Sequence, residues 1–169
     1  MTLKITIRDI AFVLRCSGAA TVAYMLAGSA FGLAHPVWAA VSAIVVSQEK
    51  LFQTRKAVVW RFAGTIVGIV IAVAAGTLTT RIGWDIAAQM GVSVALCAVL
   101  VRRWPDLKVA MWTAPIVFFS NEAGTSLLMA GYARGSEVIL GGMIGALTHW
   151  IAERIIAPLE AKAGSAADG

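Results

Sequence analysis

Stretches of apolar residues alternate with short polar segments along the whole chain, and this pattern predicts six helices. The apolar stretches cover residues of about 10–30, 34–47, 58–78, 84–101, 108–121 and 135–156. A transmembrane helix needs roughly 20 mostly apolar residues, and the second and fifth stretches are shorter than that. The pattern predicts an all-α, polytopic membrane protein with six transmembrane helices.

Two prolines modify this picture at the two short stretches. Pro36 stands where the second helix is expected to begin, and proline suits the first turn of a helix. Pro115 lies inside the fifth stretch, where we expect it to kink the helix. We expect one six-helix transmembrane domain over residues 1–160, followed by a short disordered cytoplasmic tail over residues 161–169.

Composition supports a membrane protein, because 59% of the 169 residues are hydrophobic and only 14% are charged. The net charge of +5 does not indicate nucleic-acid binding, since basic residues flank membrane spans as topology determinants. Most of them fall on one side of the predicted membrane, whereas Arg81 and Arg134 fall on the other. This asymmetry places both termini in the cytoplasm.

An internal repeat emerges when the sequence is aligned with itself at an offset of 73 residues. Polar residues match as well as aliphatic ones: Ser47, Gln48, Glu49, Arg61 and Gly68 fall on Ser120, Asn121, Glu122, Arg134 and Gly141. Each unit, about 1–78 and 79–157, holds three spans, so the second must enter the membrane in the opposite sense. The sequence therefore predicts a 3+3 inverted repeat, an architecture common among transporters.

Small residues recur every four positions in the third and sixth spans and give each helix one smooth face. The glycines on these faces are Gly64, Gly68, Gly76, Gly141 and Gly145. Such faces let helix backbones approach closely, either within one protomer or between protomers.

Arginines at the predicted ends of these spans are the main candidates for a functional role. Arg61 precedes Gly64 and Thr65 by one turn, so its side chain begins on the packed face. It can extend its guanidinium to the lipid headgroups, or it can bind a carboxylate through its fork of donors. The repeat places Arg134 at the equivalent point on the opposite side, and Arg15 lies about two turns into the first span.

The sixth span also carries ionisable groups, Glu137 and His149, near the two ends of its glycine face. Glu137 can pair with Arg134 three residues earlier. His149 titrates near neutral pH and is a candidate for proton coupling, as is Glu137. The alternative for His149 is a hydrogen-bonding contact between helices.

Motifs of the main enzyme classes are absent from the sequence. It has no phosphate-binding glycine loop, no HExxH metal site, no nucleophile elbow and no paired Cys/His cluster. We therefore expect neither an enzyme nor a protein with a metal or cofactor.

Two segments resemble the fusaric acid resistance protein-like family, which includes the aromatic acid exporters. The first, "HPVWAAVSAIVVSQEKLFQTRKAVVWRFAGTIVGIVIAVAAG", carries the similarity in His35, Pro36 and Trp38 and in the later Arg61, Gly64, Thr65 and Gly68. The second, "YARGSEVILGGMIGALTHWI", is similar to the last membrane helix of the family. The resemblance implies a six-helix unit that exports or conducts aromatic or other carboxylates in a bacterial inner membrane. Members commonly have two such units or an added cytoplasmic domain, so a single unit implies a homodimer.

We therefore expect an exporter of organic anions in which Arg61, Arg134 and Arg15 attract the carboxylate, with Thr65 nearby. Trp112 and Phe118, near the fifth span, are expected to select the substrate. Two alternatives remain open at this point: a passive anion channel, because basic residues suffice to select anions, and a membrane scaffold or partner subunit that transports nothing. The expected partners are the bilayer, the organic anion and a second copy of the chain, and we do not expect nucleic acid to be a partner.

Overall fold

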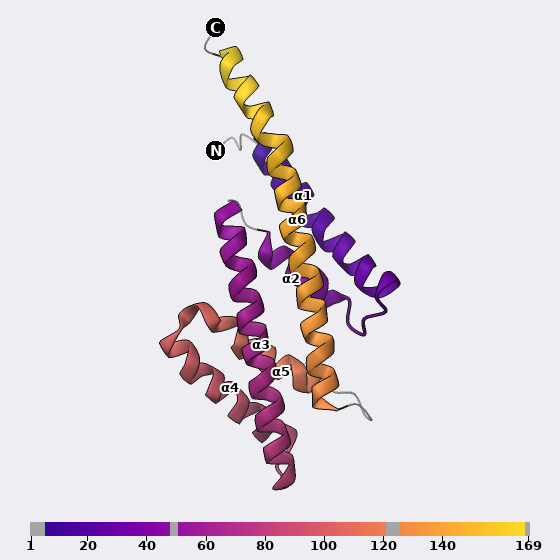
Figure 1. The fold of residues 1–169 in the computed structure, drawn as a ribbon, viewed down its shortest axis with the longest axis vertical. Helices are drawn as coiled ribbons and strands as arrows, with labels where there is room; N and C mark the ends of the chain where they lie inside the picture. Colours follow the sequence, from indigo (N-terminus) through magenta and orange to yellow (C-terminus); the bar gives the residue numbers. More distant parts are fainter. Residues whose placement is uncertain (1–5, 48–50, 121–125, 168–169) are drawn as a thin grey trace, which may run out of the picture.

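A computed structural model describes residues 6–47, 51–120 and 126–167, which are helical apart from short connections (Figure 1). In these ranges the α-helices are α1 (Ile7–Met25), α2 (Val37–Val46), α3 (Leu51–Arg81), α4 (Ile86–Arg103), α5 (Val109–Phe119) and α6 (Leu127–Ala167). A π-helical turn, η1 (Leu26–Ala30), continues α1, and a 3₁₀ turn, η2 (Pro105–Lys108), precedes α5. The predicted all-α architecture of six helices is confirmed for the described ranges.

Local sequence explains where several of these helices begin. At α1, the Asp9 carboxylate accepts the Thr6 backbone N–H at 2.8 Å, and the Thr6 hydroxyl oxygen accepts the Asp9 N–H at 3.3 Å, forming a capping box. At α4, the Asp85 side chain accepts the Ala88 N–H at 2.7 Å. Between α3 and α4 the chain turns at Gly83, whose φ of 78° favours glycine.

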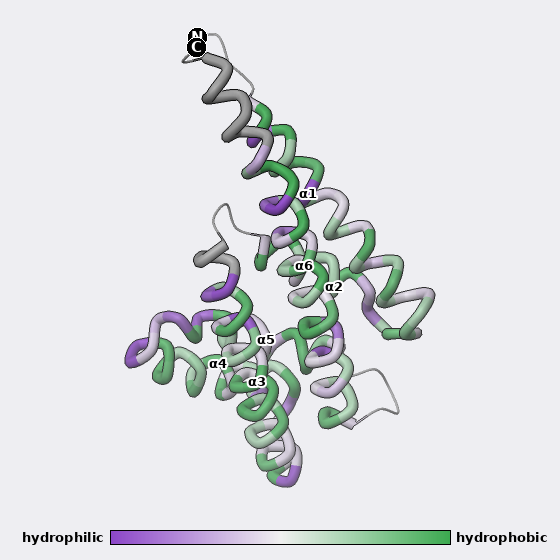
Figure 2. The backbone as a smooth tube through the Cα atoms, turned by 45° about the horizontal axis from the view of Figure 1, so that its top comes forward, coloured by the Kyte–Doolittle hydropathy of each residue, from purple (hydrophilic) through white to green (hydrophobic). Residues whose placement is uncertain are grey.

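The short helices differ from the long ones in what they can span. By length and composition, the described helices that can cross a membrane lie within Ile7–Ala30, Arg55–Arg81, Ile86–Arg103 and Leu127–Pro158. At 1.5 Å per residue, α2 and α5 are only about 15 and 17 Å long, roughly half of a bilayer core. Pro115 lies inside α5 without ending it. Hydrophilic residues lie at connections between helices, for example between α4 and α5 (Figure 2).

Two helices begin earlier than their apolar patterns predict. The third begins at Leu51 rather than near 58, and the sixth at Leu127 rather than near 135. Hydropathy detects only the apolar part of a helix, whereas the backbone continues through polar residues with good helix propensity. For the same reason α6 continues through the alanine-rich end of the chain to Ala167, so the predicted disordered tail is helical over 161–167.

The centre of the molecule is an antiparallel pair formed by α3 and α6 (Figure 1). Gly131 lies against Ile69, and Gly142 lies against Phe62, so the two helices run in opposite directions. The α1 and α2 helices pack on α6, whereas α4 and α5 pack on α3. In Figure 1, α1 and α4 therefore flank the central pair on opposite sides.

Buried positions in the two halves coincide as an inverted repeat requires. At the offset of 73, α3 and α6 share buried positions: Arg61 and Arg134, Gly64 and Glu137, Thr65 and Val138, Gly68 and Gly141, Ala72 and Gly145, Gly76 and His149. At an offset of 71, four buried residues of α2 match four of α5: Ala39, Ser42, Ala43 and Val46 with Ala110, Thr113, Ala114 and Val117. The change of offset explains why an ungapped alignment shows only part of the similarity. The predicted unit boundary near 78 falls inside α3, and residues 48–49 and 121–122 lie outside the described residues.

The glycine faces pack within one chain. A Cβ added to Gly68 would lie 2.9 Å from the Ala110 carbonyl oxygen of α5, and one added to Gly145 would lie 2.5 Å from the Ala43 carbonyl oxygen of α2. A Cβ on Gly141 would overlap with the Ala39 carbonyl group. The sequence did not decide whether the glycine faces pack within one protomer or between protomers. In the structure they form the α3–α5 and α2–α6 contacts of a single chain.

Candidate functional site

Two arginines are buried in the central helix pair. Arg61 on α3 is 2% exposed, and Arg134 on α6 is 1% exposed. Because α3 and α6 begin earlier than the apolar patterns predict, each arginine lies about two turns after the start of its candidate span. The two helices are antiparallel, so these starts lie at opposite ends of the helix pair. Neither side chain extends to the surface, so the alternative in which Arg61 reaches the lipid headgroups does not apply.

The guanidinium of Arg134 lies over the indole ring of Trp38, with its central carbon 4.5 Å from the ring centroid. A cation above an indole face is attracted by the ring quadrupole, and the contact also fixes the plane of the guanidinium. Among the described residues, the Nε and Nη1 atoms of Arg134 have no hydrogen-bond partner. Two donor atoms of a buried cation therefore remain for a ligand.

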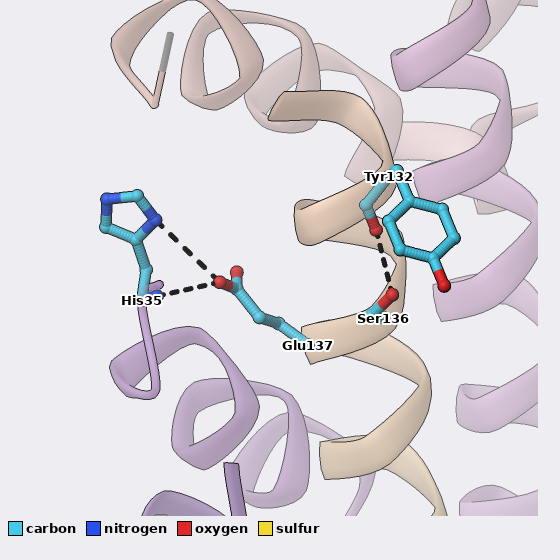
Figure 3. Close-up of polar contacts among 4 residues, drawn as sticks. All are labelled: His35, Tyr132, Ser136 and Glu137. Atoms are coloured by element: carbon cyan, nitrogen blue, oxygen red, sulfur yellow. Dashed lines mark hydrogen bonds and ion pairs between the residues drawn. The ribbon is translucent and has the colours of Figure 1, made fainter. Parts of the chain in front are cut away.

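Glu137, one turn after Arg134, is held by the start of α2 (Figure 3). Its Oε1 accepts the backbone N–H of His35 at 3.0 Å and lies 3.8 Å from the Nδ1 atom of the same residue. The predicted local pair of Arg134 and Glu137 does not form as a contact, since among the described residues neither a hydrogen bond nor an ion pair joins them. Their charges still attract one another.

Arg61 and Arg134 lie near enough for their charges to repel one another. The sequence predicts one arginine near each mouth, whereas the antiparallel overlap of α3 and α6 brings both toward one central region. Thr65, one turn after Arg61, is 2% exposed, and its hydroxyl has no hydrogen-bond partner among the described residues. Two buried cations and one carboxylate leave an excess of positive charge, which is costly unless an anion or water balances it.

Arg15 and His149 lie elsewhere, at the interface of α1 and α6. Arg15 is 9% exposed and lies over the ring of Phe12 at 5.2 Å, and its charge interacts with His149. His149 is completely buried, and both of its ring nitrogens lack hydrogen-bond partners among the described residues. Because His149 lies about 18 Å from Glu137 along one helix, these two residues do not form a direct proton relay.

The aromatic residues proposed from the sequence are not the ones near the arginines. Trp112 is 49% exposed on α5, and Phe118 is buried in a core cluster with Ala72 and Cys97. The ring that contacts Arg134 is that of Trp38, from a helix far away in the sequence. The signal that could have identified it is its place in the "HPVW" segment that opens α2.

Within the described residues, no group of three or more His, Cys, Asp or Glu side chains is placed to hold a metal ion. We take as the candidate site the buried Arg61, Thr65 and Arg134 together with Trp38, with Glu137 bound to His35 beside Arg134. Its chemistry is that of donors and positive charge for an anion.

Comparison with known proteins agrees with this architecture. The family model described as "Fusaric acid resistance protein-like" matches residues 22–148, well over half of the chain. No curated protein and no solved structure matches the chain. Together with helices long enough to cross a bilayer, the match shows that the chain is a multi-pass membrane protein that belongs to the fusaric acid resistance protein-like family, a family of membrane transporters.

Proposed function

We propose that the protein exports organic anions, aromatic or other carboxylates, across a bacterial inner membrane. The observation that carries this proposal is the buried Arg134 guanidinium, which lies on Trp38 and has two donors without partners among the described residues. A carboxylate is the group whose charge and acceptors match such a cation.

Arg61 and Thr65 complete the proposed site from the other half of the repeat. The field of two guanidinium groups attracts an anion from either side of the membrane, and the Thr65 hydroxyl offers a further donor. The Trp38 indole orients the Arg134 guanidinium and offers an apolar edge to the rest of the substrate. Arg15 has no part in this site, because it lies at the α1–α6 interface.

The inverted packing of the two halves favours a carrier. In transporters built from inverted repeats, one repeat moves against the other around a central site, so that access alternates between the two membrane faces. We also propose a parallel homodimer with both termini in the cytoplasm. A scaffold without transport activity is less well supported, since the glycine faces pack within one chain and Arg134 has donors left for a ligand.

The test is transport in proteoliposomes that contain the purified protein, with benzoate as the probe anion. We expect saturable benzoate flux and counterflow. Arg134→Gln should lower the apparent affinity for benzoate by about 10- to 100-fold, because a hydrogen bond to a charged group contributes roughly 1.5–3 kcal/mol.

Arg154→Gln is the matched control, since Arg154 lies on the exposed surface of the same helix, over Trp150 at 5.0 Å. It should leave the flux unchanged. If Arg134→Gln and Arg61→Gln both transport benzoate like the wild type, the proposed site is wrong. Long single-channel openings in a planar bilayer, without counterflow in proteoliposomes, would show that the protein is a channel and not a carrier.

A further inference from the structure

The outer surface between α1 and α6 contains two adjoining cavities that the proposed anion site does not use. The first is polar, has a volume of about 270 Å³ and is lined by residues that include Arg8, Asp9, Arg15 and Glu153. The second is a groove of about 410 Å³ with an almost wholly apolar lining. Arg15 lines both cavities, so the groove continues from the polar cavity.

The order of these cavities follows the polarity of the membrane. The polar cavity is built from the start of α1 and from the last turns of the candidate span Leu127–Pro158. The groove extends farther into both spans, along Leu14, Gly18 and Val22 of α1 and Ile151 of α6. A site that is polar at the end of two spans and apolar deeper in has the profile of a phospholipid, with its headgroup outermost and an acyl chain below.

Charges of both signs line the polar cavity. Arg8 and Arg15 supply two cations, and Arg15 is nine-tenths buried at the junction with the groove. The Asp9 Oδ2 atom accepts the N–H and the hydroxyl of Thr6 in the helix cap, and Glu153 is the other carboxylate in the lining. This combination complements a headgroup with an anionic phosphate and a cationic ammonium group.

We propose that the α1–α6 surface is a binding site for one molecule of phosphatidylethanolamine. Its phosphate lies against Arg8 and Arg15, its ammonium group against Glu153, and one acyl chain fills the groove beside Gly18. The site is separate from the anion site, because Glu153 lies about 28 Å along α6 from Arg134. The proposal therefore does not depend on the transported substrate.

Lipid binding can be measured on the purified, delipidated protein in a mild detergent. We expect phosphatidylethanolamine to raise the midpoint of thermal unfolding in a saturable way, because a ligand that binds only the folded state stabilises it. Phosphatidylglycerol lacks the ammonium group, and phosphatidylcholine has no N–H to donate to Glu153, so both should bind at least fivefold more weakly. Inorganic phosphate should produce no shift.

Two substitutions separate the headgroup from the acyl chain. Glu153→Gln should remove the preference for phosphatidylethanolamine over phosphatidylglycerol. Gly18→Leu should fill the groove and lower lipid affinity at least tenfold, without a folding defect, because a Cβ at Gly18 meets nothing within 4 Å. Gly91→Leu is the matched control, since Gly91 on α4 is equally open; it should bind lipid like the wild type.

Native mass spectrometry gives a second readout, as one retained lipid per protomer in the wild type and in Gly91→Leu, and its loss in Gly18→Leu. The proposal is overturned if phosphatidylglycerol binds as tightly as phosphatidylethanolamine. It is also overturned if inorganic phosphate alone reproduces the thermal shift, or if Gly18→Leu and Gly91→Leu retain lipid equally.

Discussion

The two halves of the molecule hold equivalent arginines in different ways. One turn after Arg61 stands Gly64, and a Cβ there would lie 2.8 Å from Val109 Cβ at the start of α5. One turn after Arg134, the equivalent position is Glu137, which accepts the His35 N–H at the start of α2. One short helix is thus held by close packing, whereas the other is held partly by a carboxylate.

This difference teaches that an inverted repeat can be symmetric in packing but asymmetric in chemistry. The van der Waals contact at Gly64 does not respond to pH or to an anion. A carboxylate contact can weaken, either when the carboxylate takes up a proton or when another anion competes for the nearby guanidinium. We expect the α2 side to be the adjustable side of the site and the α5 side to be the fixed one.

The largest effect is expected at the glycine contacts that both halves share. Gly141→Val should destabilise the protein by about 3 kcal/mol or more, because its side chain would overlap with the Ala39 carbonyl group of α2. Gly68→Val should do the same against the Ala110 carbonyl oxygen. The measurement is the yield of folded protein and its thermal midpoint in detergent, with Gly18→Val as the control. Normal stability of Gly141→Val would contradict the close α2–α6 contact.

The next effect concerns Trp38, which distinguishes the Arg134 half. Trp38→Leu keeps an apolar side chain but removes the ring beneath the guanidinium. A buried cation–π contact is worth about 2 kcal/mol, so the apparent affinity for benzoate should fall by roughly 10- to 30-fold. Trp112→Leu is the matched control on α5 and should change affinity little, because Trp112 is half exposed. Equal losses in both variants would remove the proposed distinction between the two rings.

Glu137→Gln tests whether the α2 contact depends on charge. Acidification protonates a carboxylate, which weakens its bond to the His35 N–H, so amide hydrogen exchange of residues 31–35 should rise at low pH after correction for the intrinsic rate. The groups that face Glu137 are Arg134, through its charge, and the His35 imidazole, whose Nδ1 atom lies 3.8 Å from Glu137 Oε1. His35→Gln, which retains the backbone donor, separates the two groups.

In Glu137→Gln the exchange should already be fast at neutral pH and should no longer depend on acidification. The start of α5 should show no comparable change in the wild type. A transport rate that responds to a pH gradient in the wild type but not in Glu137→Gln would link this contact to proton coupling. The idea fails if Glu137→Gln keeps the full pH dependence of exchange.

The smallest effect is expected at a buried hydroxyl. The Ser42 hydroxyl donates to the Val138 carbonyl oxygen of α6 at 2.9 Å, whereas the equivalent Thr113 hydroxyl donates to Val109 of its own helix at 3.0 Å. Ser42→Ala should cost about 0.6–1 kcal/mol of stability, as measured for hydrogen bonds between membrane helices. Thr113→Ser keeps the local bond and should cost less. If Thr113→Ser loses more stability than Ser42→Ala, the Ser42 hydroxyl does not form the more important interhelical bond.

The sequence predicted the helices and their order, because apolar stretches report on burial in lipid without needing tertiary information. It located Arg61 and Arg134 through the match of polar residues in the repeat, and Glu137 as an ionisable group near one end of the glycine face of the sixth span. It misplaced the starts of α3 and α6, since polar turns of a helix leave no hydropathy signal.

Contacts between distant residues were beyond the sequence. The repeat placed Arg61 and Arg134 on opposite sides, but their mutual repulsion depends on how far α3 and α6 overlap. Trp38 is one of six tryptophans. Its place in the "HPVW" segment sets it apart, but its contact with the Arg134 guanidinium depends on how α2 packs on α6. The bond from the His35 backbone to Glu137 joins residues 102 positions apart, and a backbone donor has no sequence signature.

The glycine contacts have a consequence for how such chains can diverge. At Gly141 and Gly145 even one methyl group would push α2 away from α6. Relatives should therefore keep glycine at these positions, whatever substrate they transport. At Gly91 nothing opposes an added side chain, and substitution should accumulate freely. An alignment of relatives would then separate two kinds of glycine that look alike in one sequence. Glycines that set the distance between helices should be invariant, and glycines without a packing role should vary.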